Sequence, residues 1–93
     1  MDTGQAIKQL RKKRGLNQAE LAERCGMSVN AICSLETGKS YPPMETVKTI
    51  CKALDIPQSY FLLFSIDMND VPERKRKLFK SILEPIKDYL MDE

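Results

Sequence analysis

The sequence contains no histidine and no tryptophan, and its 93 residues include only three cysteines and four glycines. Because histidine is absent and Cys25, Cys33 and Cys51 lack the spacing of zinc ligands, we expect no metal site. The sequence also shows no histidine general base, no glycine-rich phosphate loop and no paired carboxylates on an apolar face. The sequence therefore predicts a protein that is not an enzyme and binds no cofactor.

Long apolar stretches are absent too. No run approaches the ~20 residues of a membrane-spanning helix. The opening MDTGQAIKQL lacks the basic start and apolar run of a signal peptide. We therefore expect a cytoplasmic protein with no membrane partner and with reduced cysteines. Cys25 and Cys51 should pack as small apolar residues, whereas a redox role for the more exposed Cys33 is the alternative.

Neither sign of charge dominates, since the formal net charge is only +2. Residues 1–66 hold nine Lys and Arg against six Asp and Glu, whereas residues 67–93 hold six against seven. The basic excess that suits a nucleic-acid partner thus belongs to the first part of the chain. The basic run from Arg74 to Lys77 is expected to be a solvated helix face, with a second DNA site as the alternative.

The segment NQAELAERCGMSVNAICSLETGK, residues 17–39, predicts two short helices joined by a tight turn. Asn17 and Glu20 have the spacing of a capping box, and Gly26 suits the left-handed residue that ends a helix. Ser28 is a good N-cap for the second helix. This is the layout of a helix-turn-helix, in which the second helix enters the DNA major groove.

The two faces of the second helix differ in character. Ile32 and Leu35 are expected to point inward, whereas the outer face carries small or uncharged side chains, namely Asn30, Ala31, Ser34 and Thr37. Such a face can approach a base edge without steric or charge conflict. Two alternatives are an ordinary helical hairpin and an adaptor that uses the same fold for protein binding. An adaptor should present a more apolar or more strongly charged surface here.

The run NQAELAERCGMS followed by IxxLExGK resembles the lambda-repressor-like family, also called the Xre or Cro/cI type of helix-turn-helix regulator. The resemblance covers about Ile7 to Leu62. It implies an all-α fold: a compact bundle of five short helices, with helices 2 and 3 as the helix-turn-helix, followed by a C-terminal helical extension. It also implies a sequence-specific transcriptional repressor that binds double-stranded DNA, reading a palindromic operator as a homodimer.

Regulators of phages or mobile elements, restriction-modification controllers and antitoxins that pair with a toxin all share this size, so the subclass stays open. The resemblance also assigns roles to single residues. Gln18 would contact a phosphate, Lys39 and Ser40 would hold phosphate after the third helix, and Asn30 is chemically the best base reader. The full DNA-binding set is Asn17, Gln18, Ser28, Val29, Asn30, Ser34, Lys39 and Ser40. Arg11 and Glu36 are expected to form a partly buried ion pair.

Residues 67–93 extend beyond the resemblance and are predicted to be a helical dimerisation segment, separate from a DNA-binding domain over residues 1–66. Asp70 and Glu73 match a capping box, and Pro85 predicts a kink or a new helix start. Surplus apolar residues predict a dimer interface made by helix 5 and this segment. That interface comprises Tyr60, Phe61, Phe64, Leu78, Phe79, Ile82, Leu83 and Ile86. The alternative is that the segment folds back onto its own chain.

Overall fold

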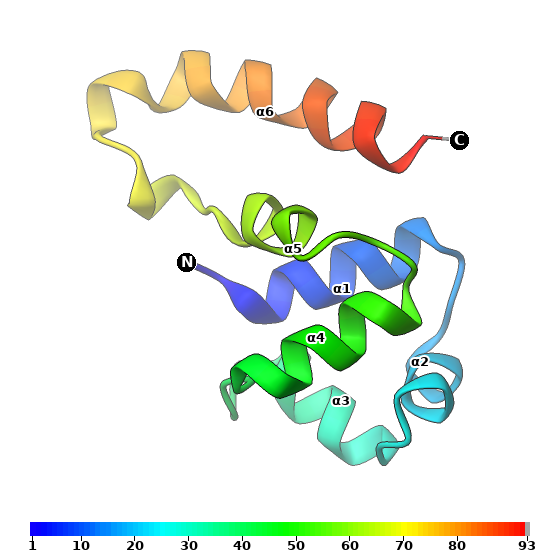
Figure 1. The fold of residues 1–93 in the computed structure, drawn as a ribbon. Coiled ribbons are helices and arrows are strands. Elements are labelled where there is room, and N and C mark those ends of the chain that lie inside the picture. The colour runs from blue at the N-terminus through cyan, green and yellow to red at the C-terminus, as the bar shows by residue number, and fades with distance from the viewer. Residues whose placement is uncertain (93) are drawn as a thin grey trace.

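The computed structural model describes residues 1–92, which form α-helices and two short 3-10 helices, with no strand in that range. The elements follow in the order α1 (Thr3–Lys13), α2 (Gln18–Cys25), α3 (Val29–Glu36), α4 (Met44–Ala53), α5 (Gln58–Ser65), η1 (Met68–Asp70), η2 (Glu73–Lys75) and α6 (Arg76–Met91) (Figure 1). The predicted all-α fold, with five short helices and a helical extension, is confirmed. No helix within residues 1–92 has the length and apolar character needed to cross a membrane.

Local signals set both ends of α2 and the start of α3. Asn17 Oδ1 accepts from the amide of Glu20 at 2.7 Å, and Glu20 Oε1 accepts from the amide of Asn17 at 3.0 Å, which completes the predicted capping box. Gly26 ends α2 with φ of 66°, a conformation that costs little without a Cβ. Ser28 Oγ then accepts from the amide of Ala31 at 3.1 Å and caps α3. The predicted turn is therefore confirmed.

α1 occupies the centre of the body and packs against α3 and α5 (Figure 1). Helices as short as α2, α3 and α5 are marginal alone in water, so burial of their apolar faces must hold them in place. Each fully buried Leu or Ile stabilises the folded state by about 1.5–3 kcal/mol. The core buries Ile32 and Leu35, as expected from the sequence, together with Ile7, Leu10, Leu21, Val47 and Ile50.

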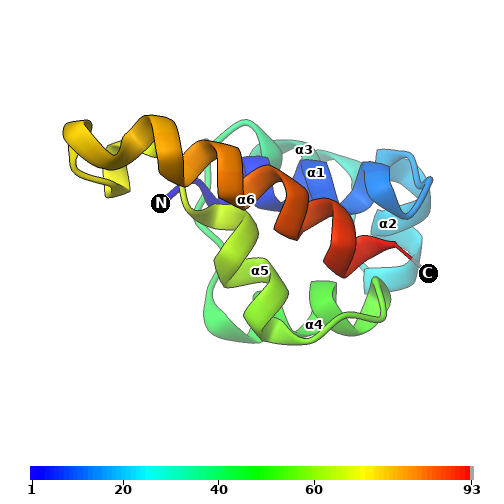
Figure 2. The same cartoon turned by 90° about the horizontal axis from the view of Figure 1, so that it is seen from above.

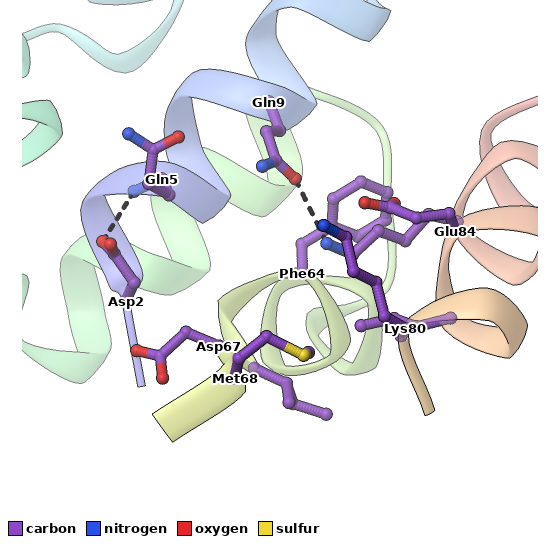
Figure 3. Close-up of a pocket in the computed structure, with 11 residues that line it drawn as sticks. Asp2, Gln5, Gln9, Phe64, Asp67, Met68, Lys80 and Glu84 are labelled. Carbon is purple, nitrogen blue, oxygen red and sulfur yellow. Dashed lines mark hydrogen bonds between the residues drawn. The ribbon is translucent and has the colours of Figure 1, made fainter. Parts of the chain in front are cut away.

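α6 folds back across α1 and α5, at the end of the molecule opposite to α3 (Figures 1 and 2). The side chains that it buries are Leu83, Lys87 and Met91. Lys87 Nζ lies 5.2 Å from the ring centre of Phe64 and donates to Gln9 Oε1 at 3.3 Å, the bond drawn from Gln9 in Figure 3. A cavity of about 210 Å³ remains beside these contacts. One face of α6 is thus packed on its own chain.

The start of α6 differs from the sequence prediction. The capping box forms one turn earlier, with Asp67 and Asp70 capping η1, and Glu73 begins η2 instead of the long helix. Pro72 provides the physical reason, because a proline disfavours helical geometry at the residue before it. Val71 is accordingly extended, with φ of −115° and ψ of 133°. The long helix therefore starts only after η2.

Pro85 does not begin a new helix, because α6 runs without interruption from Arg76 to Met91. The proline ring cannot donate to the carbonyl of Ser81, but both residues are exposed, so water can reach that carbonyl. The Ser81 hydroxyl donates to the carbonyl of Leu78 at 2.7 Å. The solvent-facing side of the helix therefore tolerates the proline.

Gly4 marks a very close approach of α1 to α3. A Cβ built on Gly4 would lie 2.6 Å from the carbonyl oxygen of Glu36 and 2.7 Å from that of Leu35. These are backbone atoms at the C-terminal end of α3, and they cannot move without moving the helix. The sequence did not single out Gly4, because a tertiary contact rather than a turn requires the glycine.

We predict that Gly4→Ala destabilises the protein, although alanine favours a helix over glycine by ~1 kcal/mol. Forcing a methyl group against α3 should cost about 1–3 kcal/mol and outweigh that gain. Thermal and urea unfolding measure the change. Gln5→Ala, an exposed neighbour in the same helix, is the matched control and should be near neutral. Unchanged or increased stability of the Gly4 variant would contradict the close approach.

A buried ion pair joins α1 to the end of α3. Arg11 Nε donates to Glu36 Oε2 at 2.7 Å and Arg11 Nη2 donates to Oε1 at 3.0 Å, with side chains only 9% and 3% exposed. The hydrogen bond to Glu36 and its negative charge raise the pKa of Arg11, against the opposing effect of burial. Arg11 Nη1 also donates to the carbonyl of Leu16 at 2.8 Å, and Gln18 Nε2 donates to Glu36 Oε1 at 3.1 Å. The network therefore connects α1, α2 and α3.

We predict that Glu36→Gln strongly destabilises the protein, because it leaves the Arg11 charge buried without a carboxylate. Removing one partner of a buried pair costs about 3–5 kcal/mol. The control is Glu23→Gln, which removes an exposed carboxylate from α2. Urea unfolding should show a large loss for the first variant and almost none for the second. Equal stability of the two variants would mean that the pair contributes nothing to the fold.

Candidate nucleic-acid interface

α3 presents an exposed and uncharged face at the end of the molecule opposite to α6 (Figure 1). Burial of Ile32 and Leu35 fixes the rotation of the helix about its axis. Residues one turn apart then share the outward side. The sequence-predicted residues found there are Ser28, Val29 and Asn30, which are exposed, and Ser34, which is half-buried. Residues 28–35 contain no charged side chain.

The side chains on this face differ in their free hydrogen-bonding capacity. Within residues 1–92, the Asn30 amide has no hydrogen-bond partner, so both its oxygen and its NH₂ group are available. The Ser28 oxygen already accepts from the amide of Ala31, which leaves its O–H donor. Val29 is 44% exposed and offers only an apolar contact. The arrangement suits an amide that reads a base edge beside a small apolar contact.

At the start of α2, the predicted DNA-binding side chains of Asn17 and Gln18 form hydrogen bonds within the protein. The Asn17 side chain is engaged in the capping box, and the Gln18 side chain is held by Glu36. The first-turn amides of the helix carry the positive end of its dipole, which favours a phosphate. Any phosphate contact at α2 would therefore use backbone amides and the second N–H of the Gln18 NH₂ group, because the first donates to the Glu36 carboxylate.

The loop after α3 brings a cation beside the same face. Gly38 has φ of 82° and turns the chain away from the helix. Lys39 and Ser40 are both exposed, and the Ser40 amide donates to the carbonyl of Ser34 at 3.2 Å. This hydrogen bond holds the loop against α3. The structure thus places Lys39 and Ser40 next to the helix that carries Asn30.

The apolar residues expected at a dimer interface divide into two groups. Phe61, Phe64 and Leu83 are buried within the chain itself, so they do not contribute exposed surface to the expected interface. Tyr60 is half-buried and packs against the same core. The remaining four lie on α6, where Phe79 is half-buried and the exposed residues are Leu78, Ile82 and Ile86. Tyr89, which the sequence analysis did not name, is 79% exposed on the same helix.

A second exposed apolar surface lies beside the end of α3 and was missed because its residues come from three separate elements. We call it the flank surface; it consists of Tyr41 in the loop after α3, Met44 at the start of α4 and Leu62 on α5. These side chains are 71%, 62% and 55% exposed and line a hollow of about 200 Å³. Helical spacing cannot reveal such a patch, since no single helix contains it.

All three cysteines are at least half-buried. Cys51 is buried and Cys25 half-buried, and burial raises the pKa of both thiols. A raised pKa lowers the thiolate fraction and with it the reactivity. Cys33 is half-buried on α3.

Comparison with known proteins agrees with this arrangement. Residues 7–61 match the helix-turn-helix family, so α6 lies outside the matched range. The chain is 31% identical over 85 residues to the cryptic phage CTXphi transcriptional repressor RstR of Vibrio cholerae, which covers 90% of this chain and 77% of RstR.

Two further relatives are similar over a shorter range. The HTH-type transcriptional activator BcrR of Enterococcus faecalis is 39% identical over 56 residues, and the immunity repressor protein of Bacillus phage phi105 is 36% identical over 59 residues. These alignments cover 60% and 63% of this chain but only 28% of BcrR and 41% of the phage repressor. The family match, the capped turn between α2 and α3 and the exposed face of α3 together show that the chain belongs to the helix-turn-helix transcriptional regulators of the lambda-repressor (Xre) type.

Proposed function

We propose that the protein is a transcriptional repressor that binds double-stranded DNA sequence-specifically, with α3 in the major groove. The observation that supports this most directly is the unpartnered Asn30 amide on an exposed, uncharged helix face. A base-reading amide must be free of protein partners, because a bidentate pair with adenine uses both its oxygen and its NH₂ group. RstR and the phi105 immunity protein are named as repressors, which favours repression over activation.

Phosphate contacts would position α3 near its C-terminal end. The start of α2, where Gln18 contacts Glu36, lies there, and so do Lys39 and Ser40 in the loop after α3. Such contacts set affinity and register without reading sequence, whereas Asn30 and Ser34 would read bases. Substitution of a phosphate-contacting residue should therefore lower the affinity for all DNA sequences, whereas substitution of a base-reading residue should lower the affinity for the operator.

We predict that Asn30→Ala costs ~1–3 kcal/mol at a single base pair of the operator and relaxes the preference there. Lys39→Ala should weaken all sequences alike and flatten the dependence of affinity on salt. An operator is first selected from a random DNA pool. Fluorescence anisotropy then compares that operator with random DNA at several salt concentrations. Equal losses on both DNAs for the Asn30 variant would contradict base reading.

The repressor is proposed to read a palindromic operator as a homodimer. Two α3 helices that read one face of a duplex are ~34 Å apart and related by a two-fold axis that points into the DNA. The interface of such a pair must contain this axis, so it lies on the side of the molecule beside α3. The flank surface of Tyr41, Met44 and Leu62 has this position.

α6 does not meet this geometric condition. It lies at the opposite end of the molecule from α3 (Figure 1), so a two-fold pair formed through its outer face would point the two α3 helices away from each other. We therefore assign pairing on one duplex to the flank surface. Of the assignment that the sequence favours, this keeps α5, through Leu62, and replaces the C-terminal segment.

We predict that Leu62→Glu weakens binding to a palindromic operator by about tenfold or more, a loss of at least ~1.4 kcal/mol. Binding to a single half-site should be unchanged, because Leu62 is exposed and belongs to α5 and not to α3 itself. Ile82→Glu, an equally polar change on the outer face of α6, is the matched control and should leave both affinities unchanged. If Ile82→Glu weakened binding to the palindromic operator and Leu62→Glu did not, the interface of the DNA-bound dimer would lie on α6 instead.

A further inference from the structure

The exposed face of α3 has no cationic side chain. From Met27 to Gly38 the only charged residue is Glu36, and its buried carboxylate accepts from Arg11 and Gln18. The commonest specific contact to a base is an arginine or lysine that donates to both O6 and N7 of guanine. A carboxylate that accepts from the N4 amino group is the corresponding contact to cytosine. Helix α3 therefore presents neither of the side chains that read a G·C pair best.

The amide of Asn30 distinguishes the two purines. Asn30 is exposed in the first turn of α3, and its side chain offers one donor group and one acceptor. In the major groove adenine presents an acceptor at N7 and a donor at N6, which match the amide in pairs. Guanine presents acceptors at both N7 and O6, so one of them would face the amide oxygen. The amide therefore favours adenine and disfavours guanine.

Val29 places an apolar contact directly before this amide. It is the first residue of α3 and is 44% exposed. The apolar group that a base pair presents in the major groove is the C5 methyl group of thymine. An A·T pair thus offers a partner for each of the two side chains, whereas a G·C pair offers no methyl group to the valine.

The hydroxyl groups of the same face do not alter this preference. Ser28 retains one O–H donor, and a serine hydroxyl pairs with several bases alike. The same holds for Ser34, which is half-buried one turn after Asn30. The Thr37 hydroxyl donates to the carbonyl of Cys33 at 2.9 Å, so its proton is used within the helix. Base identity on this face is therefore set by the first turn of α3.

We propose that the first turn of α3 reads A·T pairs, with Asn30 on an adenine and Val29 against a thymine methyl group. This inference rests on the proposed DNA binding of α3 and adds the identity of the bases. It concerns the pairs that these two side chains contact. Lys39 lies beyond the Gly38 turn and binds phosphate in the proposed complex.

Uracil substitution tests the valine contact, because uracil differs from thymine only by the missing methyl group. Each thymine of the selected operator is replaced singly, and binding is measured by fluorescence anisotropy. One replacement should weaken the wild type about fourfold, the factor equivalent to the ~0.8 kcal/mol of one buried methylene group. Val29→Ala should bind the thymine and uracil operators alike at that position. The control, Asn30→Ala, should keep the difference. Absence of any such thymine, or an undiminished loss with Val29→Ala, would overturn the valine contact.

Purine analogues test the amide contact. In 7-deazaadenine a C–H replaces N7, which removes the acceptor that pairs with the Asn30 NH₂ group. One such replacement should weaken the wild type roughly fivefold, about half of a bidentate pair, and should leave Asn30→Ala unaffected. The matched analogue is 7-deazaguanine, placed at each guanine in turn. A guanine whose replacement weakens the wild type but not Asn30→Ala would show that the amide reads guanine and would overturn the proposal.

The selection itself separates this inference from the proposed function. The wild type, Val29→Ala and Asn30→Ala are each selected against the same random DNA pool. The positions at which a variant loses the preference of the wild type are those that its missing side chain reads, and we expect A·T pairs there. An enriched operator with G·C pairs at these positions would overturn the inference and leave sequence-specific binding intact. If the wild type enriched no sequence, the proposed function would fail, and the inference with it.

Discussion

The Arg11–Glu36 pair is the contact on which the position of α3 depends. One carboxylate at the end of α3 accepts from Arg11 of α1 and Gln18 of α2, while the same arginine donates to the carbonyl of Leu16 in the connection between them. Such a network is stable inside a protein only when its members are satisfied. Within residues 1–92 no buried side-chain nitrogen or oxygen lacks a partner. The recognition helix is thus fixed by a polar network as well as by the apolar core.

The close approach at Gly4 belongs to the same constraint. A two-pronged arginine bond to a carboxylate has a narrow geometry, so α1 and α3 must lie at a set distance. At that distance only hydrogen fits on Cα of residue 4. The ion pair and the glycine therefore depend on each other, and both determine where the exposed face of α3 lies relative to the body.

The two ends of the molecule have different surface chemistry. The α3 end is polar and uncharged, with Lys39 at its edge, whereas the outer face of α6 exposes apolar side chains. Short-range hydrogen bonds suit base reading, whereas an exposed apolar row suits contact with another apolar surface. Separation of the two surfaces lets each be occupied without hindering the other.

The sequence by itself determined the elements that depend on neighbours in the chain. The capping box of Asn17 and Glu20, the left-handed Gly26 and the apolar spacing of α1 to α4 are local, so their structures could be predicted. On α6, by contrast, tertiary structure alone decided which apolar residues lie inside. Leu83 and Ile82 are adjacent and both apolar, yet one is buried and the other exposed, because α6 packs on the body through the face that carries Leu83 and Lys87, with Lys87 over Phe64. Helical periodicity places Ile82 and Leu83 on different faces of α6. Only the path of the chain between α5 and α6 decides which of these faces packs on the body.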